Sequence, residues 1–92
     1  MKTLPLKLRK NGFNYTQVQR GKRSCIYEQR VSENSVCFEV FLIKIRPERK
    51  VRDKTLEAAE RFPNNEAFGY WAWTYKNYED AINKFNEIEK EY

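Results

Sequence analysis

The sequence predicts a small α+β domain: a five-stranded, mainly antiparallel sheet (a meander) with a C-terminal helix packed on one face. Residues 36–45, V-C-F-E-V-F-L-I-K-I, are rich in β-branched and aromatic residues, and they predict a central strand apolar on both faces. Short polar turns separate the apolar segments before it, which favours hairpins. Residues 78–91 repeat apolar side chains at helical spacing. The 92 residues are expected to form one domain with a single core.

Three further strands are expected before the central one, joined by tight turns. The expected ranges are residues 3–9, 13–20 and 23–31. Pro5 lacks an N–H group, so the first strand belongs at an edge of the sheet. Asn11-Gly12 is typical of a two-residue type I′ turn, in which both residues have positive φ. Gly21-Lys22 and the polar residues 32–35 predict the next two turns.

The turns predict which residues face each other. With two-residue loops at both early turns, Leu8 faces Tyr15, and Tyr15 faces Glu28. The face expected to form the core then collects Leu4, Leu6, Leu8, Phe13, Tyr15 and Ile26. The opposite, basic face collects Lys7, Arg9, Asn14, Thr16, Val18, Arg20, Arg23, Cys25, an exposed Tyr27 and Gln29. A one-residue shift in either turn exchanges the two faces, and the face that the central strand turns to the core stays open.

A long excursion, residues 47–69, is expected after Pro47 ends the central strand. A weak apolar stripe predicts a short helix over residues 54–61, and Phe62 and Phe68 are expected to hold the segment against the body.

The end of the chain predicts a fifth strand followed by the helix. Residues 70–76 place Trp71, Trp73 and Tyr75 on one face, where they are expected to pack beneath the helix. If the helix covers the other face, the same row becomes an exposed aromatic platform. Asn77 is a good N-cap for the helix, with an aspartate three residues later imitating a capping box.

Charge divides the chain into a basic and an acidic part. The net charge is +5, but residues 1–54 contain 14 Lys and Arg against 5 Asp and Glu, whereas residues 55–92 contain 4 against 8. The division predicts a surface with two electrostatic poles. The alternative is that the basic side chains only solvate the strands and protect the sheet edges.

Catalysis and cofactor binding have little support in the sequence. Histidine is absent, the three glycines form no phosphate-binding loop, and no metal-ligand spacing occurs, so we expect no enzyme, cofactor or metal. Glu28 and Glu39 could approach each other across neighbouring strands. Cys25 and Cys37 are not expected to face each other and should be reduced. No apolar run or signal pattern is present, which favours a cytoplasmic protein without a membrane partner.

Basic residues interleaved with aromatic ones predict contact with nucleic acid at low sequence selectivity. The expected contact residues are Lys7, Arg9, Lys10, Arg20, Lys22, Arg23, Tyr27, Arg46, Arg49, Lys50 and Arg52. The second reading is a protein-interaction module, in which the basic body binds an acidic protein or the acidic helix of another copy.

Three segments carry a resemblance: K-N-G-F-N-Y-T near the start, E-R-F-P-N-N-E-A-F-G before the last strand and E-D-A-I-N-K-F in the helix. With them the chain resembles small uncharacterised proteins encoded by phages and mobile elements of gut Bacteroidetes, including the crAss-like phages. That resemblance implies a location in the host cytoplasm and no assigned activity. The ending T-Y-K-N-Y-E-D-A-I-N-K-F is also similar to the ending of WGR domains, which bind DNA ends, although the Trp-Gly-Arg signature is missing.

Overall fold

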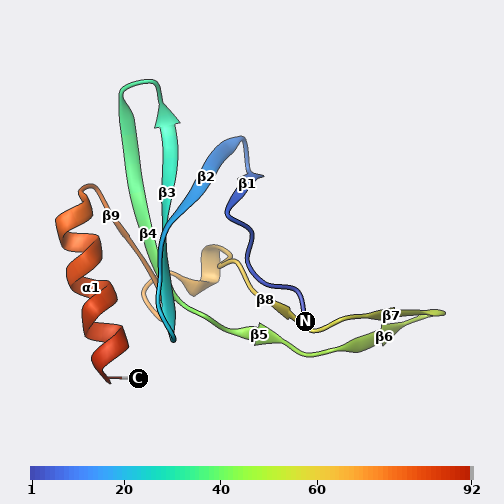
Figure 1. Ribbon diagram of the computed structural model, residues 1–92. Coiled ribbons are helices and arrows are strands. Elements are labelled where there is room, and N and C mark those ends of the chain that lie inside the picture. Colours follow the sequence, from blue (N-terminus) through green and yellow to red (C-terminus); the bar gives the residue numbers. More distant parts are fainter. Residues whose placement is uncertain (92) are drawn as a thin grey trace.

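A computed structural model describes residues 1–91 and has the expected α+β architecture. Five antiparallel strands lie in the order β1-β2-β3-β4-β9, and the helix α1 packs on one face of this sheet (Figure 1). The elements are β1 (Lys7–Lys10), β2 (Phe13–Arg20), β3 (Ser24–Ser32), β4 (Ser35–Leu42), β9 (Ala72–Tyr75) and α1 (Tyr78–Glu91). The prediction of fold class, including the position of the helix along the chain, is confirmed.

The first hairpin forms as its turn sequence predicts. Asn11 and Gly12 have φ of 54° and 84°, as a type I′ turn requires, and Leu8 pairs with Tyr15. Between β3 and β4 a two-residue turn leaves Ser32 opposite Ser35.

The register between β2 and β3 differs from the predicted one and exchanges the faces of β3. Tyr15 pairs with Gln29 rather than Glu28, because the loop between Arg20 and Cys25 is longer than two residues and a bulge follows Gln17. The shift turns Cys25 into the core cluster that contains Tyr15, on a face where Cys25 was not expected.

Tyr27, expected to be exposed, is therefore fully buried, and Ile26 packs on the opposite side under the helix. Leu6, expected in the core, is 71% exposed because it precedes β1 at the open edge of the sheet.

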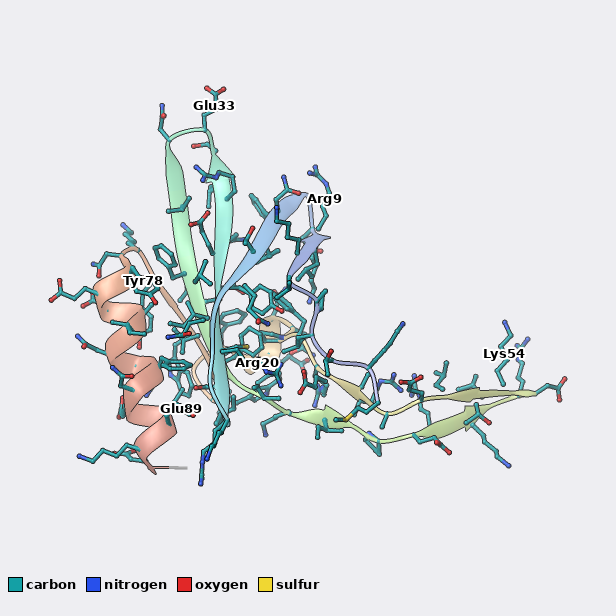
Figure 2. All side chains as sticks on the ribbon, in the orientation of Figure 1. Arg9, Arg20, Glu33, Lys54, Tyr78 and Glu89 are labelled. Atoms are coloured by element: carbon teal, nitrogen blue, oxygen red, sulfur yellow. The ribbon has the colours of Figure 1, made fainter. Side chains whose placement is uncertain are left out.

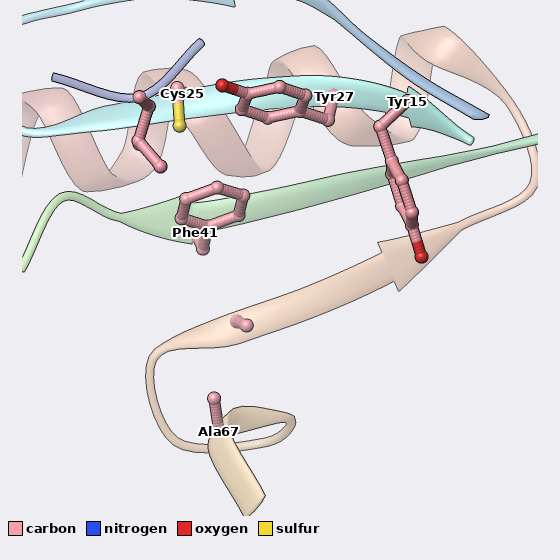
Figure 3. Packing of buried hydrophobic residues seen from close by; sticks show 7 residues of the cluster. Tyr15, Cys25, Tyr27, Phe41 and Ala67 are labelled. Carbon is pink, nitrogen blue, oxygen red and sulfur yellow. The ribbon is translucent and has the colours of Figure 1, made fainter. Parts of the chain in front are cut away.

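The first core lies on the sheet face opposite the helix and is mainly aromatic (Figure 3). The Tyr27 and Phe41 rings stack with centroids 5.6 Å apart, and Phe62 meets Tyr15, Tyr27 and Phe41 edge-on at 5.0–5.3 Å. Such pairs contribute about 0.5–1.5 kcal/mol each beyond the area they bury. Phe62 thereby holds the excursion against the sheet, as the sequence predicts.

The second core lies between the sheet and the helix. Ile26 and Val40 pack against Ala81, Phe85 and Ile88 of α1. Both faces of β4 are thus covered, since its neighbouring residues Val40 and Phe41 are each fully buried on opposite sides.

The aromatic row of the fifth strand divides between the two cores. Trp73 and Tyr75 pack beneath the helix as predicted. Trp71 instead packs against the first core, because it precedes β9 and does not follow the strand's alternation. The three side chains therefore do not form an exposed platform.

The helix is anchored at both ends by side chains. At its start Asn77 Oδ1 accepts the N–H of Asp80 at 2.8 Å, which confirms the predicted N-cap. Near its end the Glu89 carboxylate accepts the N–H groups of Lys22 and Arg23 at 2.9 Å and the hydroxyl of Ser24 at 2.6 Å. Burial alone would raise the pKa of Glu89, but these hydrogen bonds outweigh it and lower the pKa.

The excursion contains a β-hairpin in place of the predicted helix over residues 54–61. Its strands are β5 (Ile45–Arg46), β6 (Arg49–Val51), β7 (Lys54–Leu56) and β8 (Ala59–Glu60), followed by a short 3-10 helix, η1 (Asn65–Ala67). The helix prediction is wrong because the apolar stripe has no surface to cover. Residues 44–61 leave the sheet as a two-stranded ribbon, called the arm below (Figure 1).

The two cysteines, Cys25 and Cys37, are free. No helix in residues 1–91 is long and apolar enough to span a bilayer. Over the same residues no three metal-ligating side chains come together.

Candidate nucleic-acid interface

The base of the arm is fixed to the body by backbone pairing. The N–H of Lys2 donates to Ala58 O at 2.9 Å, and the N–H of Glu60 donates back to Lys2 O at 2.8 Å. Arg61 N–H donates to Lys44 O at 2.8 Å across the two arm strands. The N-terminal segment thus pairs with the base of the arm through an isolated parallel bridge between Lys2 and Ala59.

An ion pair completes the attachment. Both terminal nitrogens of Arg20 donate to the carboxylate of Glu60, at 2.8 and 2.6 Å, and Leu4 N–H donates to the same carboxylate at 2.9 Å. The hydrogen bond from Arg20 lowers the pKa of Glu60 and, reciprocally, raises the pKa of Arg20. Arg20 therefore lies at the joint of the arm with its charge compensated.

The outer half of the arm carries the basic side chains that the sequence places there. Arg49, Lys50, Arg52 and Lys54 are all exposed, and Lys54 projects near the far end of the ribbon, well away from the Glu89 side of the molecule (Figure 2). In the described chain none of these four takes part in an ion pair. Their positive charge is therefore open to a ligand.

Arg52 occupies an unusual backbone position at the tip. Its φ is 57°, in the left-handed region that glycine and asparagine occupy more easily. Glycine would adopt this conformation with less strain, so Arg52 is held there by the turn of the ribbon at some cost in stability.

Arg46 lies nearer the base of the arm and is half-buried. It donates through Nη2 to Glu57 O of the opposite strand at 3.2 Å, whereas its Nη1 atom is buried and has no hydrogen-bond partner among the described residues.

The other predicted residues do not form one continuous face. Lys7 and Arg9 are exposed on the edge strand β1, on the helix side of the sheet but beyond the strands that α1 covers. Lys22 and Arg23 are exposed in the turn whose backbone holds Glu89.

Two predicted residues face the first core instead of the solvent. Lys10 Nζ donates to Pro63 O at 3.0 Å and lies 5.1 Å from the centroid of the Phe62 ring. Tyr27 is buried and donates its hydroxyl to Pro5 O. Tyr27 is therefore unable to stack on an external base. Its inclusion among the contact residues was wrong, because the register shift described above turns its side chain into the core.

A cavity of about 180 Å³ lies beside Lys10 and was not foreseen from the sequence. Its wall includes the aromatic side chains Phe13, Phe62 and Phe68. Its polar residues are Lys10, Tyr15, Gln29 and Glu39, together with Asn11 and Asn65 at the rim. A signal was present: Glu39 is the one charged residue between Ser35 and Ile43, in the most apolar strand of the chain.

Glu39 is the most unusual group in this cavity. It is 6% exposed, and its Oε1 atom accepts no hydrogen bond from any residue that the structure describes. Burial raises the pKa of Glu39 to about 7, against a smaller opposing effect of the Lys10 charge.

The possible carboxylate pair of Glu28 and Glu39 does not form. Glu39 pairs with Tyr27 in the ladder, whereas Glu28 pairs with Phe38 and turns to the opposite face of the sheet. There Glu28 accepts from Arg30 at 3.4 Å.

Comparison of the chain with protein-family models, curated proteins and solved structures finds no match.

Proposed function

We propose that the protein is a non-enzymatic module that binds nucleic acid with low sequence selectivity, chiefly through the arm. The observation that carries the proposal is the exposed cluster Arg49, Lys50, Arg52 and Lys54 on the outer half of a projecting ribbon, where these side chains outnumber the carboxylates Glu48 and Asp53 and form no ion pair among the described residues. Phosphate contacts supply most of the affinity of non-selective nucleic-acid binding.

The shape of the arm suits a groove. Eight residues from Ile45 to Arg52, at about 3.3 Å per residue, give a reach of roughly 25 Å. A two-stranded ribbon is narrow enough to enter the major groove of duplex DNA, which is about 12 Å wide. Lys7 and Arg9, at the opposite edge of the sheet from β9, supply secondary contacts to the backbone of a longer ligand.

Low selectivity follows from the chemistry of the arm side chains. Between Arg49 and Lys54 they are mainly ammonium and guanidinium groups, which favour phosphates over base edges. The cytoplasmic location and the phage or mobile-element origin stay predictions from the sequence.

Fluorescence anisotropy with labelled duplex and single-stranded DNA and RNA at low salt tests the proposal. We expect the double variant Lys50→Glu/Arg52→Glu to bind at least tenfold more weakly than the unchanged protein. Its matched control, Lys76→Glu/Lys90→Glu, also lowers the net charge from +5 to +1, but at exposed positions outside the arm. Equal losses in both variants would contradict a role for the arm, and absence of binding by the unchanged protein would refute the proposal.

Self-association is the second candidate, and the placement of charge favours it over other protein contacts. The arm and α1 lie on opposite sides of the sheet (Figure 1), and the helix exposes Glu79, Glu87 and Glu91. The arm of one copy would then meet the helix of another. Light scattering across a salt series tests it: association that disappears with added salt supports this candidate, and a monomer throughout contradicts it.

A further inference from the structure

We propose that the cavity around Glu39 binds one planar, neutral, amino-substituted six-membered ring, of which the cytosine base is the representative. The cavity lies against the first core, between the β1–β2 turn and the segment that follows the arm, and its rim residues Asn11 and Asn65 are exposed. The inference rests on the proposed function in one respect only: if the ring is a base within a nucleic-acid strand, the arm binds that strand.

The walls and the volume indicate a single flat ring. Phe13, Phe62 and Phe68 present aromatic surface to the cavity, and aromatic side chains are the common stacking partners of unpaired bases. An apolar cavity of about 150 Å³ holds benzene, so the volume of about 180 Å³ accommodates one six-membered ring with its substituents.

Glu39 indicates that the ring carries an N–H donor. Its Oε1 is buried and accepts no hydrogen bond from residues 1–91, and a buried acceptor without a partner is costly. A ligand amino group would remove that cost. Acceptance of the cytosine amino group by a glutamate carboxylate is an established mode of base recognition.

The other polar groups require an acceptor elsewhere on the ligand. Tyr15 accepts from Gln29 Nε2 at 2.9 Å, which leaves its own hydroxyl proton to donate. Burial and the nearby Glu39 raise the pKa of Tyr15, so the phenol keeps that proton. The Lys10 ammonium donates one N–H to Pro63 O and has two further N–H groups that can donate to a ligand. Cytosine provides a carbonyl oxygen and a ring nitrogen for these donors.

Lys10 also argues against an organic cation as the ligand. The aromatic wall and the carboxylate alone would suit an amine, but the Lys10 ammonium lines the same cavity and lies over the Phe62 ring. A second cation would be repelled there, whereas a neutral donor is not.

Titration of the ¹⁵N-labelled protein with cytidine and, separately, uridine tests the inference. The two nucleosides differ at position 4, where uridine has a carbonyl oxygen in place of the amino group, and at N3, which accepts a hydrogen bond in cytidine and carries a proton in uridine. We expect cytidine to shift the amide signals of Tyr15, Gln29 and Glu39, and to bind at least tenfold more tightly than uridine. Glu39→Met, which removes the acceptor but preserves the approximate volume, should abolish the difference. Glu39→Gln retains an acceptor oxygen and should preserve a preference for cytidine.

Oligocytidylate and oligothymidylate of equal length separate a free nucleoside from a base on a strand. A preference for oligocytidylate that Glu39→Met removes, without detectable binding of free cytidine, assigns the site to strands. No preference among either the nucleosides or the oligomers overturns the inference. If oligomers then still bind through the arm, the proposed function stands. If cytidine binds but the arm variant behaves like its control, the proposed function fails and the cavity site stands.

Discussion

Replacement of Glu39 by glutamine is expected to stabilise the fold above neutral pH and to change it much less in acid. Burial raises the pKa of Glu39 from 4.5 to about 7 in the folded protein. The folded carboxyl therefore retains a proton that the unfolded chain releases between these values, and stability falls as the pH rises through that window. Above it the charge is buried, and the displacement of the pKa corresponds to a cost of about 3 kcal/mol.

Urea denaturation of the unchanged protein and Glu39→Gln, at about pH 4 and about pH 8.5, measures this effect on either side of the window. We expect the variant to gain about 2–3 kcal/mol at the higher pH relative to the lower one, which is a shift of 10 °C or more in melting temperature for a domain of this size. Glu33→Gln makes the same chemical change in the exposed β3–β4 turn and serves as the control. An equal difference at both pH values would show that the Glu39 carboxyl does not titrate as a buried group and would refute the reasoning.

Three further outcomes follow from single contacts. Arg52→Gly should raise the free energy of unfolding by up to about 1 kcal/mol, because the φ of 57° at this position suits glycine, and it should weaken nucleic-acid binding. Urea denaturation measures the first effect and fluorescence anisotropy the second. A loss of stability would contradict the prediction. Gly21→Ala should lower the free energy of unfolding by about 1–2 kcal/mol, because an added Cβ would lie 2.4 Å from Glu89 Cδ and displace that carboxylate from its three donors. The double variant Gly21→Ala/Glu89→Ala should be little less stable than either single variant, and additive losses would argue against a shared contact. Arg20→Met should lower the free energy of unfolding by about 1–2 kcal/mol at neutral pH, a modest figure because the arginine is partly exposed. The loss should be smaller in acid, because the pKa of Glu60 is lowered in the folded protein and the stabilisation by its carboxylate disappears as the pH falls below 4.5. Urea denaturation at two pH values distinguishes this result from a pH-independent loss.

The parts of the fold that depend on local patterns could be predicted from the sequence. The Asn11-Gly12 turn, the central strand and the capped C-terminal helix each follow from residues close together in the chain. The turn and the helix form where expected, whereas the central strand ends at Leu42 and the expected last residue, Ile45, belongs to the arm strand β5. The strand order follows as well, because successive hairpins leave little freedom in a meander.

The β2–β3 register could not be predicted, because it depends on two irregularities that the sequence does not mark. The loop after Arg20 is longer than the expected two residues, and the bulge after Gln17 alters the pairing again. A shift of one residue then decides that Tyr27 is buried. The buried aromatic core around Phe62 is the tertiary reason that this register is favoured over the predicted one.

The arm could not be predicted as a ribbon, because its outer half has no core to impose a period of two. Arg49 to Thr55 are all exposed, so their sequence carries the charge of the site but not its shape. The Glu39 cavity has the opposite character: the lone carboxylate is visible in an apolar strand, whereas its companions come from β1, β2, β3 and the segment after the arm. Only the folded chain brings them together.

The salt dependence of binding is the most direct test of the account. If four arm side chains each neutralise one phosphate, a plot of log affinity against log salt has a slope of about −3 to −4, and a fourfold rise in salt weakens binding roughly 50- to 150-fold. We predict that Lys50→Glu/Arg52→Glu makes this slope shallower by about 2, whereas Lys76→Glu/Lys90→Glu leaves it within about 0.5 of the unchanged protein. A slope that is near zero, or that changes equally in both variants, would contradict the claim that the arm is the nucleic-acid-binding element.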